Sequence, residues 1–106
     1  MLAFDSVGHG PDPLVVLVHG WPLDRSTWQG VAGRVARSGY RVLSPDLPDF
    51  GESPPLEVPL ASVEVIADAI AGFLEAFGPH RFAIAGHSFG GYVVLALAEG
   101  RPDLVA

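Results

Sequence analysis

Short apolar runs alternate along the chain with longer segments in which apolar residues recur at helical spacing. The runs predict strands at Leu14–Val18, Arg41–Ser44 and Arg81–Ala85. The first run is apolar throughout, which is typical of a strand buried on both faces in a parallel sheet. A weaker strand is expected at Leu2–Val7, and a turn cluster rich in glycine and proline follows it at residues 8–13.

The first predicted helix begins at a cap formed by Asp24 or Ser26 and ends near Ser38, with Gly39 as its stop signal. Three apolar residues at helical spacing give this helix one face toward the core: Trp28, Val31 and Val35.

Ser62 is expected to cap a second helix over Val63–Phe77, and a third helix covers Phe89 to about Gly100. Between the first and second helices, Pro45–Pro55 is predicted as a loop and Leu56–Leu60 as irregular. The second helix carries a 3.6-period stripe of core residues: Ile66, Ile70, Phe73, Leu74 and Phe77.

This order of strand, helix, strand, helix, strand, helix predicts an α/β fold with a mostly parallel sheet and right-handed crossovers. A chain of 106 residues makes one domain at most. In such sheets ligands bind beyond the carboxyl ends of the strands. The candidate site is therefore expected where the strands end.

Composition narrows the class of protein. Apolar residues make up 49% of the chain, which excludes disorder, and the net charge of −6 argues against nucleic acid and anionic membrane surfaces as partners. The chain has no cysteine, so it has no disulfide and no thiolate metal site. We see no signal peptide and no apolar run of the ~20 residues that a membrane helix needs, and we expect a cytoplasmic protein.

The pattern Gly86-His87-Ser88-Phe89-Gly90 lies between the third strong strand and the third helix. Gly-x-Ser-x-Gly in that position is typical of a nucleophile elbow, a tight strained turn that lifts the serine hydroxyl out of the sheet. The turn also places the Phe89 N–H at the amino end of a helix, where negative charge is favoured. The alternative is a glycine-rich turn whose serine merely caps the helix, while a phosphate loop is excluded by the missing lysine and the spacing.

His19-Gly20-Trp21-Pro22 follows the first strong strand, and with the Ser88 pattern it resembles the α/β-hydrolase superfamily. The resemblance covers Leu2 to Ala106 and implies the front half of that fold, as a single partial domain over residues 1–106. It implies Ser88 as nucleophile and the Trp21 and Phe89 amides as oxyanion-hole donors.

Three neighbours of these residues are expected to have lesser roles. His19, Gly20 and His87 are candidates for contact with the substrate, although His19 in this pattern usually has a structural role, with its ring hydrogen-bonded within the loop. The resemblance implies no cofactor and no metal.

Residues 46–53 resemble the family loop Asp-x-x-Gly-x-Gly-x-Ser, with Asp49 in place of the first glycine. Aspartate tolerates left-handed backbone better than most residues, so the loop is expected to survive with some strain. The loop usually shapes the site, and Asp46 is not favoured as the catalytic acid because the family acid comes from a later strand.

The motifs look most like those of small esterases, lactonases and perhydrolases, which implies a small ester-like substrate. A serine nucleophile argues against haloalkane dehalogenases and epoxide hydrolases, which use aspartate at that position.

A serine needs an adjacent base, normally a histidine oriented by a carboxylate. The family order is serine, acid, histidine, but no histidine follows Ser88, and Glu99 and Asp103 are the only acids after it. We therefore expect the front portion of a longer enzyme, which pairs with a C-terminal complementing segment or with a second copy through the edge of the strand ending at Gly86. The alternatives are an inactive fragment or assembly module that keeps the elbow, and a hydrolase-like binding protein.

Overall fold

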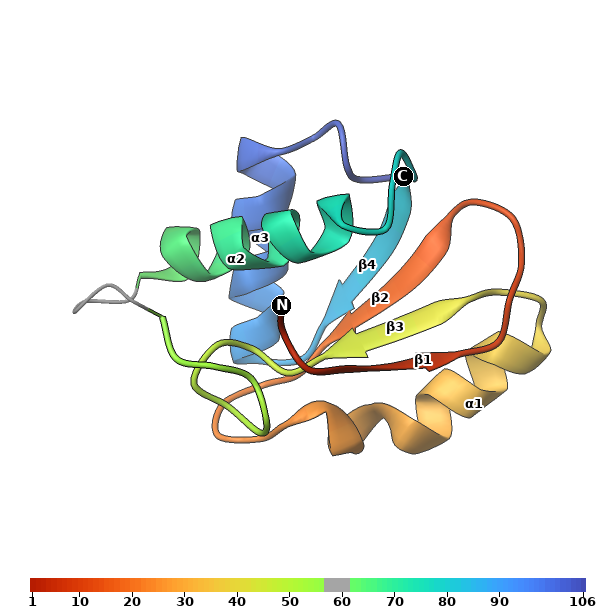
Figure 1. The fold of residues 1–106 in the computed structure, drawn as a ribbon, viewed down its shortest axis with the longest axis horizontal. Coiled ribbons are helices and arrows are strands. Elements are labelled where there is room, and N and C mark those ends of the chain that lie inside the picture. Colours follow the sequence, from red (N-terminus) through yellow and green to blue (C-terminus); the bar gives the residue numbers. More distant parts are fainter. Residues whose placement is uncertain (57–61) are drawn as a thin grey trace.

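The computed structural model describes residues 1–56 and 62–106, and they form a four-stranded sheet with helices on both faces (Figure 1). The strands are β1 (Phe4–Val7), β2 (Leu14–Val18), β3 (Val42–Pro45) and β4 (Phe82–Gly86). Their order in the sheet is β1-β3-β2-β4, with β1 antiparallel to β3 and the other neighbouring pairs parallel. The predicted mostly parallel α/β sheet is confirmed; β2 has the predicted ends, and the ends of the other strands differ from the predicted ones by at most two residues.

In the described part of the chain, three α-helices connect or follow these strands: α1 (Gln29–Arg37), α2 (Val63–Glu75) and α3 (Phe89–Gly100). In Figure 1, α1 covers one face of the sheet, while α2 and α3 lie together on the other. None of the helices in residues 1–56 and 62–106 has both the length and the hydropathy needed to cross a membrane.

The side chains of β2 enter two separate cores. Val16 and Val18 join the larger core beneath α2 and α3, whereas Leu17 packs with Ala32 and Val42 beneath α1. Successive residues of a strand point to opposite faces, so an apolar run is required where both faces are covered. The prediction that Leu14–Val18 is buried on both faces is confirmed.

The first predicted helix is divided in the structure. A 3₁₀ turn at Arg25–Trp28 precedes α1, and Asp24, not Ser26, caps it by accepting a 2.8 Å hydrogen bond from the Ser26 N–H. The predicted face was wrong at Val31, which is 45% exposed. The rotation of α1 instead turns Ala32 to the core, together with the three partly buried residues Trp28, Val35 and Ala36.

Helix α2 begins as predicted, with the Ser62 hydroxyl accepting a 3.2 Å hydrogen bond from the Val65 N–H. It ends at Glu75, two residues before the predicted end, and the Phe77 N–H closes a turn on the Leu74 carbonyl at 3.1 Å. Four residues of its predicted apolar stripe are in the core, and Phe77, beyond the end of α2, is partly buried against that core. The predicted irregular segment lies, except for Leu56, outside the described residues.

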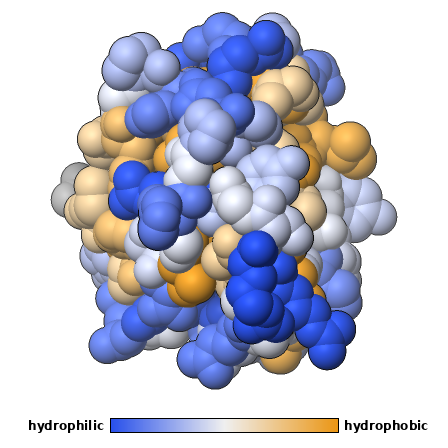
Figure 2. All heavy atoms as spheres, turned by 90° about the vertical axis from the view of Figure 1, so that its right-hand side faces the viewer, coloured by the Kyte–Doolittle hydropathy of each residue, from blue (hydrophilic) through white to orange (hydrophobic). Residues whose placement is uncertain are grey.

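The carboxyl ends of the parallel strands lie at the same end of the sheet, since Val18 of β2 is in register with Gly86 of β4. The other end of the sheet, with the loop of residues 8–13, faces the viewer in Figure 2, where hydrophilic residues predominate and hydrophobic ones form separate patches. The candidate site residues all follow the carboxyl ends of β2 and β4, at the end of the sheet opposite this surface.

Candidate active site

Ser88 lies on the turn that joins β4 directly to α3. Its backbone has φ 56° and ψ −116°, a left-handed conformation that costs a side chain-bearing residue about 1–3 kcal/mol. The Ser88 side chain makes no capping hydrogen bond to α3, and the residue is exposed. The alternative of a serine that merely caps a helix therefore has no support in this geometry.

Close approach of the backbone explains the two flanking glycines. A Cβ on Gly86 would stand 2.6 Å from the Gly91 nitrogen, and a Cβ on Gly90 would stand 2.6 Å from the His19 carbonyl oxygen. Real Cβ contacts are longer than this, so a larger residue at either position would push α3 away from the sheet. The turn is closed by a 2.9 Å hydrogen bond from the Gly90 N–H to the His87 carbonyl.

The loop that follows β2 lies against this turn. The His87 N–H donates a 3.0 Å hydrogen bond to the Val18 carbonyl, and a Cβ on Gly20 would stand 2.8 Å from the His87 oxygen and 3.3 Å from the Ser88 Cβ. The structure thus brings Gly20 against Ser88, and Trp21 and Phe89 are the next residues along the chain from this contact.

The Trp21 and Phe89 amides have no acceptor among the described residues. Within residues 1–56 and 62–106, neither N–H donates a hydrogen bond to a backbone or side-chain acceptor. Phe89 is the first residue of α3, where amides point out of the helix and the dipole is positive. Such donors can bind an anionic oxygen without first giving up another partner.

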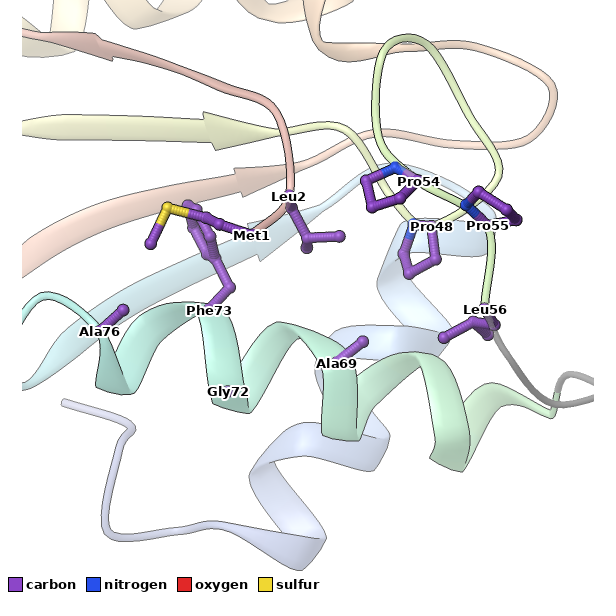
Figure 3. Close-up of a pocket in the computed structure, with 10 residues that line it drawn as sticks. All are labelled: Met1, Leu2, Pro48, Pro54, Pro55, Leu56, Ala69, Gly72, Phe73 and Ala76. Carbon is purple, nitrogen blue, oxygen red and sulfur yellow. The ribbon is translucent and has the colours of Figure 1, made fainter.

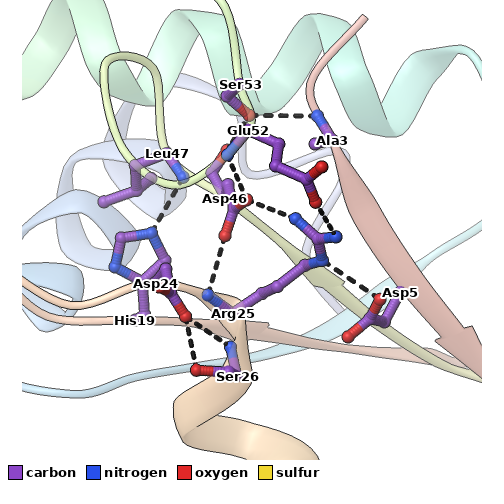
Figure 4. Close-up of polar contacts among 10 residues, drawn as sticks. All are labelled: Ala3, Asp5, His19, Asp24, Arg25, Ser26, Asp46, Leu47, Glu52 and Ser53. Atoms are coloured by element: carbon purple, nitrogen blue, oxygen red, sulfur yellow. Dashed lines mark hydrogen bonds and ion pairs between the residues drawn. The ribbon is translucent and has the colours of Figure 1, made fainter.

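His19 is buried completely and uses both ring nitrogens. Its Nε2 accepts a 2.9 Å hydrogen bond from the Leu47 N–H, so the proton is on Nδ1, which donates to the Gly20 carbonyl at 2.9 Å. Its side chain has no exposed surface for the substrate contact that the sequence left open, and it connects two loops instead (Figure 4). The expected hydrogen bonding of the ring within the loop is confirmed.

Two other histidines, His80 and His87, lie at opposite ends of β4. His87 is exposed, with its Nδ1 on the side of Gly20, where a Cβ would come within 3.1 Å of it. His80 precedes β4 and contacts Asp12 at 2.6 Å, and this hydrogen bond lowers the pKa of the Asp12 carboxyl. His80 therefore lies at the far end of the sheet from Ser88.

Asp46 is fully buried at the end of β3 and is surrounded by donors. Its carboxylate accepts hydrogen bonds from the Arg25 N–H at 2.7 Å and the Glu52 N–H at 2.9 Å, and it pairs with the Arg25 guanidinium (Figure 4). These partners occupy both carboxylate oxygens, in keeping with the expectation that Asp46 is not the catalytic acid. Sequence reasoning missed Arg25, although a buried carboxylate after a strand implies a nearby cation.

An open pocket of about 580 Å³ adjoins Ser88, and two large hydrophobic residues on its rim, Tyr92 and Leu95, are 67% and 68% exposed. A separate apolar pocket of about 350 Å³ lies between the N-terminus, the proline-rich loop and α2 and does not include Ser88 (Figure 3). No group of three or more potential metal ligands is found in the described part of the chain.

Comparisons with known proteins agree with this geometry. The chain is 36% identical to the pimeloyl-acyl-carrier-protein methyl ester esterase of Aeromonas salmonicida over 102 residues, which are 96% of this chain and 37% of that protein. It is 34% identical to the bifunctional epoxide hydrolase 2 of Sus scrofa, covering 98% of this chain and 19% of that one. The chain thus spans between about a fifth and little more than a third of the curated relatives that it matches.

Among solved structures, a thermophilic esterase from Thermogutta terrifontis superimposes with a TM-score of 0.88 and 38% identity, over 98% of this chain and 37% of that one. The protein family described as "alpha/beta hydrolase fold" matches residues 13–106 of this chain. With a serine at positive φ on the turn after β4, a mostly parallel sheet and this match over most of its length, the chain belongs to the alpha/beta hydrolase family.

Proposed function

We propose that this chain supplies the nucleophile and the oxyanion hole of a serine hydrolase that acts on an ester, a thioester or a lactone. One observation carries the proposal: Ser88 is an exposed serine held at positive φ between β4 and α3, and its hydroxyl caps no amide. Strained residues persist where the surrounding structure imposes them, and they cluster at functional sites. The similarity to esterases supports this class of substrate.

In the proposed reaction the Ser88 Oγ attacks the carbonyl carbon and its proton passes to a base. The carbonyl π electrons move to oxygen, and the resulting oxyanion accepts hydrogen bonds from the Trp21 and Phe89 amides. Collapse of this intermediate breaks the bond to the alcohol or thiol, which leaves with the proton. Water then attacks the acyl-serine in the same way, and the acid and free Ser88 are released.

The base and the acid are proposed to come from a segment outside these 106 residues. His19 has both nitrogens engaged in a buried position, and His80 is bonded to Asp12 at the other end of the sheet. His87 is next to Ser88 on the turn, but its ring lies on the side of Gly20. This supports a nucleophile that is positioned here and activated from elsewhere.

The free edge of β4 is where we place the complementing segment. Phe82 already pairs with the end of the chain, donating to the Leu104 carbonyl and accepting from the Ala106 N–H, both at 2.8 Å, as part of a parallel bridge to Val105. Alternate residues of a strand present their polar groups to the same side, so Ile84 is next along this edge. A strand continuing parallel to β4 beyond Val105 would bond to it.

A second copy is the less favoured occupant of this edge. An antiparallel pairing of two β4 strands about Ile84 would set Gly86 of the second copy opposite Phe82. The position beside Phe82 is already taken by residues 104–106 of the same chain. The bridge therefore favours a complementing segment, and it would have to break for a symmetric dimer to form.

The proposal is tested with a chimera in which this chain is followed by the part of the Aeromonas salmonicida esterase beyond the matched region. We expect Ser88 in the folded chimera to react with a fluorophosphonate probe, and the 106-residue chain alone to react at least about a hundredfold more slowly, the scale of general base catalysis. Ser88→Ala should abolish labelling, whereas Ser26→Ala, at an exposed serine of the 3₁₀ turn, should not.

A folded chimera that is not labelled at Ser88 would overturn the proposal and favour the assembly module or the binding protein. Hydrolysis of p-nitrophenyl acetate by the chimera, with loss in Ser88→Ala, is the expected result for the esterase class.

The cytoplasm stays our predicted compartment, in line with the cysteine-free composition.

A further inference from the structure

The loop that carries Trp21 is attached at both ends to two consecutive residues of the loop after β3. At its start, the buried His19 ring accepts the Leu47 N–H at 2.9 Å. At its end, the Arg25 N–H donates to the Asp46 carboxylate at 2.7 Å. Residues 20–24 thus lie between two hydrogen bonds to the same neighbouring segment, which we call the two anchors: Leu47 N–H to His19 and Arg25 N–H to Asp46 (Figure 4).

The Arg25 side chain makes the second anchor much stronger than one amide would. Its guanidinium pairs with the buried Asp46 and also reaches Asp5 on β1 at 3.0 Å and Glu52 at 2.5 Å. Hydrogen bonds to Glu52 and Asp5 raise the pKa of Arg25 above its ordinary value, so it stays a cation. Figure 4 shows the three carboxylates converging on this side chain from β1 and from the loop after β3.

Beyond Gly20, which is buried against the Ser88 turn, burial contributes little to the position of this loop. Trp21 is 67% exposed and Leu23 is 40% exposed. Inside the loop, the Leu23 N–H donates to the Gly20 carbonyl at 2.9 Å. A loop with exposed apolar side chains and one internal turn depends on its ends for a defined conformation.

We infer that Arg25 is a positioning residue, which through Asp46 holds the Gly20–Leu23 backbone, and with it the Trp21 amide, against Ser88. This inference rests on the proposed function for its catalytic consequence, but not for its structural one. A donor displaced by about 1 Å from the oxyanion loses most of its stabilising effect, because its value depends on preorganisation.

The chain offers a matched control in Arg101. This arginine also bridges two carboxylates, pairing with Glu75 at 2.5 Å and with Asp103 at 2.9 Å, and hydrogen bonds to them raise its pKa. It lies beyond the end of α3, away from the loop of residues 20–24. Loss of Arg101 therefore removes an exposed ion-pair network of two carboxylates without touching either anchor.

The structural test is hydrogen exchange in the 106-residue chain, followed at the Leu23, Arg25 and Leu47 amides. We expect Arg25→Met to speed exchange at these three amides by roughly tenfold relative to core amides of β2, which corresponds to 1.4 kcal/mol of local opening. Arg25→Lys should give a smaller effect, because a point charge replaces the guanidinium fork. Arg101→Met should leave these amides unchanged relative to the core.

The catalytic test uses the chimera and an ester substrate. Because oxyanion donors act in the transition state, Arg25→Met should lower kcat by roughly tenfold or more with little change in KM, Arg25→Lys should recover part of it, and Arg101→Met should change neither. A merely stabilising role would not separate kcat from KM in a protein that remains folded.

The two tests fail independently. Exchange at Leu23, Arg25 and Leu47 that responds equally to Arg25→Met and Arg101→Met would overturn the role of Arg25, whatever the activity. A chimera with no reaction at Ser88 would instead overturn the proposed function, and the exchange result would still decide whether Arg25 holds the loop.

Discussion

The Nε2 atom of His19 accepts a 2.9 Å hydrogen bond from the backbone N–H of Leu47, so a fully buried imidazole joins the loop after β2 to the loop after β3. Both partners of this bond are inaccessible to water. The Leu47 amide therefore has no replacement acceptor if the ring is lost. This makes His19 a structural residue of the candidate site, with consequences for stability.

We expect His19→Ala to lower the free energy of unfolding by about 2–4 kcal/mol, since it leaves a buried amide unsatisfied and opens a cavity. Urea denaturation followed by circular dichroism measures the loss. His87→Ala is the matched control, because that ring is exposed, and should change stability by less than about 0.5 kcal/mol. Equal losses in the two variants would contradict the role given to His19.

Gly90 and Gly91 provide a second comparison within one turn of α3. A Cβ on Gly90 would stand 2.6 Å from the His19 carbonyl oxygen, whereas a Cβ on Gly91 would meet nothing closer than the Gly86 oxygen at 3.8 Å. Gly90→Ala should destabilise the protein by about 1–3 kcal/mol through overpacking. Gly91→Ala should be neutral or stabilise by up to about 1 kcal/mol, because alanine favours helix.

The free energies of unfolding of these two variants, measured side by side, decide the point. Destabilisation by Gly91→Ala as large as that by Gly90→Ala would mean that helix packing against the sheet is not limited at Gly90.

Much of the fold was predictable because its signals are local. The unbroken apolar run Leu14–Val18 indicated a strand covered on both sides, and the spacing of residues in α2 indicated its buried face. The rotation of α1 was not predictable in the same way, since Val31 and Ala32 differ little as core candidates. The packing of Ala32 against Leu17 and Val42 decides which of them turns inward.

In the candidate site, too, the features with a local sequence signal were predictable and those that depend on contacts between distant segments were not. The Ser88 turn was predictable from five adjacent residues, and its positive φ agrees with the strained turn expected there. The contact of Gly20 with Ser88 needed either the family resemblance or the structure, because 68 residues separate the two. The pairing of Arg25 with Asp46 was missed, since nothing in the sequence selects which of several arginines reaches a given buried carboxylate.

Asp49 is the one departure from the family loop, and its backbone has φ 72°. Glycine adopts this conformation without steric cost, so Asp49→Gly should raise the free energy of unfolding by about 0.5–1 kcal/mol despite the added chain entropy. Asp49→Ala keeps the Cβ and loses the tolerance of aspartate, so it should be destabilising. Thermal unfolding of the three proteins tests the order, and a glycine variant less stable than the alanine variant would contradict it.

Asp24 makes stability depend on pH through its cap on the 3₁₀ turn. Hydrogen bonds from the Ser26 hydroxyl and then the Ser26 N–H lower the pKa of the Asp24 carboxyl below its ordinary value of 3.8. The folded state therefore binds this proton less readily than the unfolded chain. The stabilisation is complete above the unfolded pKa and is lost as pH falls through the folded pKa.

Asp24→Asn keeps a capping oxygen but has no charge to titrate, so it isolates this effect from the other carboxyls. Wild type should be more stable than Asp24→Asn at pH 7, and the difference should shrink steadily below about pH 4, the range in which free aspartate titrates. Urea denaturation of both proteins between pH 7 and pH 2.5 measures it. A difference that stays constant over this range would show that the Asp24 carboxylate is not held in its charged form by Ser26.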